Sequence, residues 1–538
     1  MLEALWRTPR NGPVSHPVKR DVLADGQCNV PPSSKPGYVQ SNNSQAWQDR
    51  FERVRGKGAR SSLSKIQFDF PPETPTEKVA REERQEAVRV EFLHAWNGYR
   101  THAWGHDEVL PISGRYSDAF NGWGVTLIDS LDTMVIMGLN QEFDEAVQWI
   151  KECSSFVRNP RDQYSFFETV IRYLGGLLSA YDLTGEAILL TKAQELGGYL
   201  MNAFQFGRFP IASFATDKDA NRRGGRHSLA EIGTIQIEFT RLSQLTGDPI
   251  YENSARKIFE ILDSAKLELP GLLPPYVEDF DGYSYTSYEA SVGGLMDSYY
   301  EYLLKEWILL GGSAPEYRRN FEASADAILN YLVSRPQNGT DAFAITGSVY
   351  SATKEITPQM QHLACFVPGS LAMGSKYFDR PQDMVLAKQL AEACYLSYDS
   401  SVTKIGPEVF SFLSVPGTNG KQFIVDPNTF NDRDSSNNAY ILRPETVESL
   451  WILYRLTGEK KYQDQAWSMF EAVKENCKTE IAYTGLNDVN KPMSFNDNMQ
   501  SFFLAETMKY FYLIFSTPDV ISLDAFVLNT EAHPIMRT

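Results

Sequence analysis

Leu183-Thr184-Gly185-Glu186, Leu245-Thr246-Gly247-Asp248 and Leu456-Thr457-Gly458-Glu459 are three copies of one short pattern, and looser copies occur at 137–140 and 310–312. In each copy the glycine takes the position just after a helix C-terminus, where a left-handed residue ends the helix. An aromatic-rich apolar segment precedes each turn and a more charged segment follows it. This alternation is typical of a buried helix paired with an outer helix. The sequence therefore predicts repeated helical hairpins.

The hairpins can be counted from where their helices are expected to begin. The apolar helices begin near Thr126, Glu168, Glu231, Asp297, Gln361, Glu445 and Glu506. The charged helices begin near Lys78, Gln141, Glu186, Tyr251, Pro315, Pro381 and Lys460. Seven hairpins whose apolar helices face inward close into one ring inside another. We therefore predict an all-α fold, an (αα)7 barrel, with short β-hairpins near 207–214, 271–287 and 405–425.

The first 75 residues differ in composition from the rest of the chain. They are rich in Pro, Ser, Asn and charge and show no sustained periodicity. We predict a disordered or linker-like N-terminal tail at 1–75 and a barrel domain at 76–538. The first thirty residues carry charges and prolines where a signal peptide needs an apolar block, and no run of about 18 apolar residues occurs. Neither an export signal nor a transmembrane segment is predicted.

The composition limits the choice of partners. The 538 residues include 68 acidic and 51 basic ones, giving a formal net charge of -17, and 42% are hydrophobic. The chain can bury a large core. A net negative protein repels phosphate backbones and anionic lipids, which argues against nucleic acid and membrane surfaces as partners.

Cysteines and glycosylation patterns bear on the compartment. Five cysteines allow at most two disulfides and match no C-x-x-C metal spacing; they are Cys28, Cys153, Cys365, Cys394 and Cys477. Two glycosylation acceptor patterns begin at Asn42 and Asn338. They matter only if the protein enters the secretory pathway.

Acidic residues recur in the first turn of the predicted inner helices. They are Asp129, Asp132, Glu168, Glu231, Asp297, Glu445 and Glu448, with Glu506 slightly deeper. Inner helices of such a barrel run parallel, so these carboxylates should surround one mouth. The helix dipole alone favours acids there, and Ser228-Leu229-Ala230-Glu231 is also a capping box. A whole ring of carboxylates repels itself unless a cation or a hydrogen-bonding ligand relieves it, which indicates a ligand site.

The stretch from Ile441 to Ser449 contributes two carboxylates and a guanidinium to this ring. Pro444 suits the first helical position, which sets Glu445 and Glu448 three residues apart on one face. Arg443 or a bound cation can offset their repulsion. With seven histidines, no H-E-x-x-H and no cysteine cluster, calcium with oxygen ligands is favoured over zinc. Carboxylates on opposite sides of a cavity are suited to glycoside hydrolysis.

Several motifs extend this interpretation. They are found at 95–99, 102–108, 126–133, 167–168, 171–176, 297–302, 443–449 and 529–534, the last being Asn529-Thr530-Glu531-Ala532-His533-Pro534. From about residue 84 onward the chain resembles glycoside hydrolase family 47, the class I α-1,2-mannosidases. The resemblance implies an inverting exo-α-1,2-mannosidase with an (αα)7 barrel and a Ca²⁺ cofactor. Its substrates would be high-mannose N-glycans on glycoproteins.

Position by position, the resemblance also implies roles. Glu168 matches the general acid acting through a water, Asp297 a second carboxylate also considered as the acid, and Glu445 the general base. Thr530 matches the residue that binds Ca²⁺ through its hydroxyl and carbonyl. The remaining matches are Glu448, Glu506 and Glu531 around the metal, and Glu231, Glu408, Arg443 and Phe503 as sugar contacts. Because the helix dipole should lower the pKa of Glu168, we expect the acidic proton to belong to the Glu168–Asp297 pair.

The resemblance further implies a disulfide between Cys365 and Cys394, and with it an oxidising compartment. The expected location is the lumen of the endoplasmic reticulum or Golgi, or secretion, and the expected state is a monomer. Leu295 stands where endoplasmic-reticulum members have arginine, which implies broad trimming toward a five-mannose product. Two alternatives stay open: a non-catalytic glycan-binding factor of the same fold in glycoprotein quality control, and a helical-repeat scaffold without a ligand.

Overall fold

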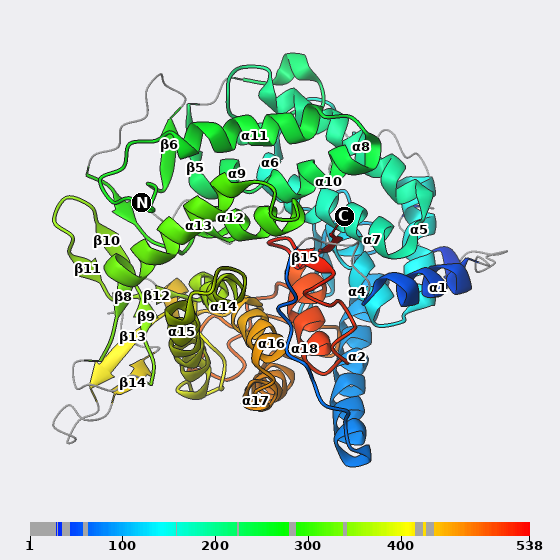
Figure 1. Ribbon diagram of the computed structural model, residues 1–538. Coiled ribbons are helices and arrows are strands. Elements are labelled where there is room, and N and C mark those ends of the chain that lie inside the picture. The colour runs from blue at the N-terminus through cyan, green and yellow to red at the C-terminus, as the bar shows by residue number, and fades with distance from the viewer. Residues whose placement is uncertain are drawn as a thin grey trace.

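The computed structural model describes residues 28, 31–34, 43–56, 63–157, 159–222, 225–278, 287–336, 342–414, 423–426 and 435–537. Its helices form two rings around a common centre (Figure 1). Both glycosylation patterns, at Asn42 and Asn338, lie outside the described residues.

The inner ring consists of seven segments. They are α3 (Val125–Asp129) with α4 (Leu131–Ile136), α6 (Phe166–Glu168) with η3 (Thr169–Leu174) and α7 (Gly175–Thr184), α9 (Leu229–Gly233) with α10 (Gln236–Thr246), α12 (Asp297–Leu309), η7 (His362–Phe366) with α14 (Val367–Phe378), α16 (Glu445–Thr457), and η9 (Phe503–Thr507) with α18 (Met508–Ile514). After its first residue, α12 is buried along its whole length, as an inner helix must be.

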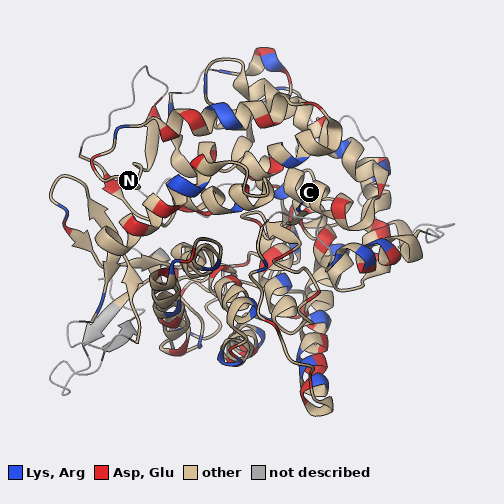
Figure 2. Cartoon of the chain, viewed as in Figure 1, with Lys and Arg blue, Asp and Glu red and all other residues tan. Residues whose placement is uncertain are grey.

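The outer ring supplies the partners of these segments. It consists of α2 (Pro75–His102), α5 (Asn140–Cys153), α8 (Ala187–Leu200), α11 (Ile250–Asp263), α13 (Pro315–Ala327), α15 (Pro381–Asp399) and α17 (Lys461–Cys477). These helices are amphipathic: α11 buries Tyr251, Ala255, Ile258, Phe259 and Leu262, one stripe at helical spacing. Acidic and basic residues are interspersed along their outer faces, most clearly on α2 (Figure 2). The predicted (αα)7 barrel is confirmed.

The turns that predicted the hairpins have the expected geometry. Gly185, Gly247 and Gly458 follow α7, α10 and α16 with φ of 72°, 74° and 72°. A residue with a Cβ is strained at this φ, and glycine is not. Each turn therefore returns the chain from an inner helix to an outer one.

Of the three stretches predicted to contain hairpins, 405–425 holds paired strands, whereas the strands at 213–214 and 276–278 pair with 164–165 and 226–228. The strands are all short and antiparallel. They are β1 (Glu108–Leu110) with β2 (Arg115–Ser117), β3 (Tyr164–Ser165) with β4 (Ser213–Phe214), β5 (Arg226–Ser228) with β6 (Tyr276–Glu278), β8 (Val333–Ser334) with β9 (Ile345–Thr346), β15 (Phe526–Leu528) with β16 (Pro534–Met536), and two three-stranded groups, β7 (Glu289–Ala290), β10 (Ser348–Tyr350) and β11 (Ile356–Thr357), and β12 (Met360–Gln361), β13 (Val409–Ser414) and β14 (Phe423–Asp426). Parts of the predicted hairpins, 279–286 and 415–422, lie outside the described residues.

The hairpin of β15 and β16 lies inside the barrel, against α12 and α7 (Figure 1). Val527 pairs with Ile535 in its ladder, and both side chains are buried. Its loop, residues 529–533, reaches the polar centre of the barrel. The hairpin therefore brings the Asn529–His533 motif to the N-terminal ends of the inner helices.

The predicted linker at 1–75 is wrong for two described segments. Residues Ser44–Val54 form the helix α1. Trp47 packs edge-on against Phe143 with ring centroids 4.9 Å apart, and Phe51, four residues on, is buried beside it on the same helix face. Farther along, the Phe68 amide donates to the Arg455 carbonyl at 2.8 Å. The aromatic residues Trp47 and Phe51 stand among charged residues, so the helical pattern of this segment was not recognised in the sequence. Both segments pack against the barrel.

Two disulfides join elements of the described chain. One links Cys365 in η7 to Cys394 in α15, as the family resemblance implies. The other links Cys28 to Cys153 at the end of α5 and so ties the N-terminal segment to the barrel. Cys477 is a buried free thiol. Among the described residues, no helix has both the length and the apolar character needed to span a membrane.

Candidate active site

Glu168 stands at the end of α6, where the inner helix changes to the π-helical turn η3. The Ser165 hydroxyl caps this helix by accepting from the Glu168 amide at 3.4 Å. Arg172, one turn later, donates through Nε to Glu168 Oε2 at 2.7 Å. The Glu168 side chain is 28% exposed while that of Arg172 is 7% exposed. Glu168 is therefore partly accessible, and its ion-pair partner is buried.

Arg172 is held in place on several sides. Its guanidinium carbon lies 4.8 Å from the ring centroid of Phe120 and 5.5 Å from that of Phe502. It also contacts Glu531 of the β15–β16 loop. These contacts fix both the charge and the direction of the group. Arg172 thus links the acid on α6 to the loop of the central hairpin.

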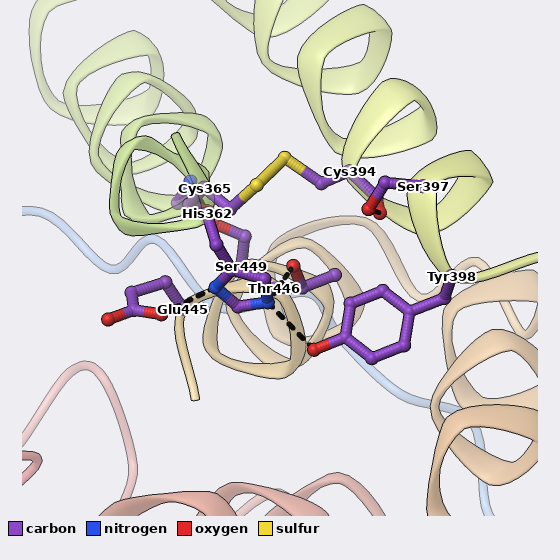
Figure 3. The surroundings of a disulfide bond; sticks show 9 residues. His362, Cys365, Cys394, Ser397, Tyr398, Glu445, Thr446 and Ser449 are labelled. Atoms are coloured by element: carbon purple, nitrogen blue, oxygen red, sulfur yellow. Dashed lines mark hydrogen bonds and ion pairs between the residues drawn. A yellow bond between two sulfur atoms is a disulfide. The ribbon is translucent and has the colours of Figure 1, made fainter. Parts of the chain in front are cut away.

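Glu445 is the first residue of α16 and accepts from His362 (Figure 3). His362 Nδ1 lies 2.7 Å from Glu445 Oε2, and Arg443 Nη1 lies 3.7 Å from Oε1. Burial would raise the pKa of Glu445, but the hydrogen bond from His362 and the charge of Arg443 outweigh burial and lower it. At neutral pH Glu445 is a carboxylate.

Arg443 pairs mainly with Glu408. Its Nε lies 2.8 Å from both carboxylate oxygens of Glu408, and its Nη2 lies 2.7 Å from Oε2. Only 4% of the arginine side chain and 19% of the glutamate side chain are exposed. The pair forms one wall of the cavity next to Glu445, and its glutamate oxygens remain partly accessible.

Asp297 begins α12 and differs from Glu445 in its protonation. Its pKa is raised to about 7, first by burial and then by the charges of Glu301 and Glu445, against a hydrogen bond from the Ser298 amide. Two residues earlier, Leu295 has a φ of 76°, a conformation that costs a non-glycine residue free energy. The Leu295 carbonyl accepts from the Ala230 amide at 2.8 Å, which holds this strained turn in place. Asp297 can keep a proton at neutral pH.

A second group of carboxylates surrounds Thr530 of the central loop. The Thr530 amide donates to the Tyr302 hydroxyl at 3.2 Å, and the residue is partly exposed. Burial and neighbouring acids raise the pKa of Glu448 to about 8, although Lys305 at 3.6 Å opposes the rise. The same causes, burial first, raise the pKa of Glu506 and of Glu531 well above the usual value. The positive charges near these three acids do not offset their burial and mutual repulsion.

The donors in this group are all oxygens, which suits a hard cation such as Ca²⁺. Within the described ranges, no three His, Cys, Asp or Glu side chains are arranged so that they could hold a metal by themselves. Any cation here would therefore depend on main-chain and hydroxyl oxygens, of which Thr530 offers both, with the carboxylates farther out.

Two members of the predicted ring do not face the cavity. Asp129 and Asp132 are fully buried. His533 lies between them, at 3.1 Å from Asp129 and 2.8 Å from Asp132, and Lys509 lies 2.9 Å from Asp132. Their first-turn positions resemble those of Glu168 and Asp297, so the sequence pattern could not separate them. Their role is to hold the central hairpin.

Two predicted sugar contacts also take other places. Glu231 completes the capping box, with Oε2 accepting from the Ser228 amide at 2.9 Å, and stays partly exposed. Phe503 is fully buried against Tyr483, with ring centroids 4.9 Å apart, so its prediction as a sugar contact is wrong. Its neighbour Phe502 instead lies over Arg172. In a π-helical segment the facing residue shifts by one position, which misleads a count of helical periodicity.

The residues that sequence reasoning missed are the partners of the acids. The spacing of Glu168 and Arg172 by four residues was a visible signal for an ion pair. His362 gave none, because it lies 83 residues from Glu445 in the chain.

The site as built can move two protons in opposite directions. It holds an ionised acid, Glu445, and an acid that keeps its proton near neutral pH, Asp297, at the mouth of one barrel. Environments that separate two carboxyl pKa values in this way assign one group as base and the other as acid. A carboxylate paired with a protonated carboxyl group is the combination that glycoside hydrolases use.

Comparison with known proteins identifies the family. The profile described as Glycosyl hydrolase family 47 matches residues 91–537. A mannosyl-oligosaccharide 1,2-alpha-mannosidase of Arabidopsis thaliana is 39% identical over 477 residues, which cover 86% of this chain and 80% of that protein. The endoplasmic reticulum mannosyl-oligosaccharide 1,2-alpha-mannosidase of Homo sapiens is 37% identical over 84% of this chain and 64% of that protein. The chain belongs to glycosyl hydrolase family 47.

A solved structure agrees with this assignment. The α-1,2-mannosidase from Trichoderma reesei superimposes with a TM-score of 0.77 at 32% identity, covering 85% of this chain and 99% of that chain.

Proposed function

We propose that this protein is an inverting exo-α-1,2-mannosidase that removes terminal α-1,2-linked mannose from high-mannose N-glycans. The names of its relatives support the substrate. One observation carries the chemistry: in a single cavity mouth, burial and nearby acids keep Asp297 protonated, while His362 and Arg443 keep Glu445 ionised.

In the proposed step, Glu445 removes a proton from water, and the oxygen of that water attacks the anomeric carbon. The bond to the leaving oxygen breaks on the opposite face, and Asp297 supplies the proton that this oxygen takes up. Glu168, paired with Arg172, is the second candidate donor and would act through a water. Glu231, Glu408 and Arg443 would hold sugar hydroxyls.

Ca²⁺ is the proposed cofactor, held by the hydroxyl and carbonyl of Thr530. Glu448, Glu506 and Glu531 would surround it through water, and a cation would favour the ionised form of these acids, whose pKa values burial and their mutual repulsion raise. When bound, the cation supplies charge that fixes sugar hydroxyls and water beside Glu445.

The test is release of free mannose from an α-1,2-linked mannose disaccharide, with and without EDTA. Release that EDTA abolishes and added Ca²⁺ restores is expected. Release unaffected by EDTA would contradict the cofactor. Glycan binding without release would favour a non-catalytic glycan-binding factor of the same fold.

The finer specificity and the setting are proposed on the same basis. Leu295 lies two residues before Asp297, at the position where endoplasmic-reticulum members have a positively charged arginine. We therefore propose broad trimming toward a five-mannose product. We also propose that the protein is a monomer in the lumen of the secretory pathway. Digestion of a nine-mannose glycan followed by chromatography should show successive products down to five mannoses. Accumulation of one eight-mannose isomer would contradict this specificity.

A further inference from the structure

A buried chain of hydrogen bonds runs from Glu445 away from the cavity. His362, which is fully buried, contacts Glu445 through Nδ1 at 2.7 Å and the Tyr398 hydroxyl through Nε2 at 2.7 Å (Figure 3). The Thr446 hydroxyl lies 3.2 Å from the same Nε2. Tyr398 is itself buried. It lies behind His362 and has no direct contact with the cavity.

The acceptor at one end of this chain decides the direction of its hydrogen bonds. A carboxylate can only accept, so the Nδ1 of His362 must donate to Glu445. With His362 neutral, one ring nitrogen donates and the other accepts, so Nε2 is the acceptor, and the nearer hydroxyl, that of Tyr398, donates to it. Exchange of the proton between the ring nitrogens would place a lone pair against the Glu445 carboxylate, and a flip of the ring would place a C–H group there.

The elements that carry this chain are joined next to it. Cys365 follows His362 by three residues and Cys394 precedes Tyr398 by four, and their disulfide links η7 to α15 (Figure 3). The Ser449 hydroxyl, one turn after Glu445 in α16, donates to the Cys365 carbonyl. The elements η7, α15 and α16 are therefore linked to each other within about one helical turn of His362, Tyr398 and Glu445.

Other charged groups lie near Glu445 and also affect its pKa. Arg443 precedes it, Asp297 faces it from α12, Glu448 lies on its own helix and Glu506 on η9. The single cation among these four is Arg443, and Glu408 also engages it. Donation from His362 is thus a large part of what keeps Glu445 ionised.

We propose that Tyr398 is a positioning residue of the hydrolase: by donating to Nε2, its hydroxyl stabilises the His362 tautomer that donates from Nδ1 to Glu445. This inference rests on the proposed function, in which Glu445 is the base. Tyr398 is buried and is proposed to act on Glu445 only through His362.

Tyr398→Phe removes the donor and keeps the ring. With the α-1,2-linked mannose disaccharide, kcat should fall about tenfold while KM changes less than about twofold. A weaker hydrogen bond to the carboxylate raises the pKa of Glu445, so the acidic limb of the kcat/KM profile should move to higher pH. Tyr483→Phe, which removes an equally buried hydroxyl bonded to Glu91, should leave that limb in place. An unmoved limb in Tyr398→Phe, or equal shifts in both variants, would overturn the proposal.

His362→Asn provides the second arm. Asparagine can donate an N–H to Glu445 but has no tautomer to fix, so adding Tyr398→Phe to this variant should not move the limb further. An additive shift would show that Tyr398 acts in another way.

A measurement on the unaltered protein covers the case in which a variant does not fold. With ¹⁵N-labelled histidine, a protonated Nδ1 and an unprotonated Nε2 are expected for His362, and the signal is assigned by its loss in His362→Asn. The reverse pattern contradicts the proposal. Glu445→Gln separates a failure of the proposed function from a failure of this inference. Wild-type turnover in Glu445→Gln would overturn the role of Glu445 as base. If Glu445→Gln is inactive but the acidic limb of Tyr398→Phe does not move, only the role of Tyr398 is overturned.

Discussion

Two groups of buried acids meet the central loop at 529–533, and they differ in their partners. Lys509 and His533 contact Asp132, so its pKa is lowered to about 2 although burial opposes this. Glu448 is also buried, and among the described residues Lys305, which Glu301 shares, and a hydrogen bond from Tyr510 do not offset burial, so its pKa rises to about 8. Burial is common to both groups, and the supply of positive charge separates them. Fully paired acids hold the fold, and underpaired acids provide a place for a ligand.

The largest expected effect lies at the mouth. Glu445→Gln should lower kcat about 10³-fold and leave glycan binding and thermal stability nearly unchanged, because the amide keeps the shape but cannot take a proton. Mannose release and isothermal titration with the disaccharide measure the two properties. Loss of binding with unchanged turnover would contradict the base role.

Asp132→Asn should act on the fold instead. It leaves Lys509 and His533 short of a counter-charge in the core, at a cost of about 3–5 kcal/mol. Urea unfolding measures this, and turnover per folded molecule should persist. Asp263→Asn, at the exposed pair with Arg319, is the control and should cost under about 1 kcal/mol. Equal losses in both variants would remove the distinction between the groups.

The underpaired acids predict a pH effect in protein stripped of divalent cations. The folded-state pKa of Glu448, about 8, lies above its unfolded value of 4.5, so the folded state binds the extra proton between these values. Stability should therefore fall as pH rises from about 5 to 8. Thermal melting across this range measures the slope, which Glu448→Gln should reduce and added Ca²⁺ should abolish. Rising stability would contradict the assignment.

The smallest effect is expected at Glu231, which is partly exposed and also a cap. Glu231→Gln should cost about 0.5 kcal/mol, because the amide oxygen still accepts from the Ser228 amide. If Glu231 also holds a sugar hydroxyl, KM should rise several-fold with kcat little changed. A melting curve measures the role of Glu231 as a helix cap, and the KM for the disaccharide measures its role as a sugar contact. An unchanged KM would mean that Glu231 acts only as a cap.

The sequence was sufficient for the barrel because its signals are local. A Leu-Thr-Gly turn and the change from apolar to charged helix indicate one hairpin each, and the count of seven hairpins together with the family motifs predicted the closed ring. The helix α1 was missed because Trp47 and Phe51 lie among charged residues, and a short charged segment reads as linker unless its i, i+4 pairs are examined.

The candidate site could be predicted only in part. The family motifs marked Glu168, Asp297 and Glu445, but whether an acid is paired depends on groups far away in the chain. Asp129 owes its burial to His533, more than four hundred residues later. His362 likewise reaches Glu445 only through the fold.

The helix α2 packs against α17 and α18, and this closure of the ring has a kinetic consequence. Lys478 and Tyr483 both contact Glu91, 387 and 392 residues away in the chain. Contacts at such separation form late, because the chain entropy of the loop must be lost before the contact is gained. Until they form, the apolar faces of α2 and α18 remain open to other chains, so the barrel is most prone to aggregate just before it closes.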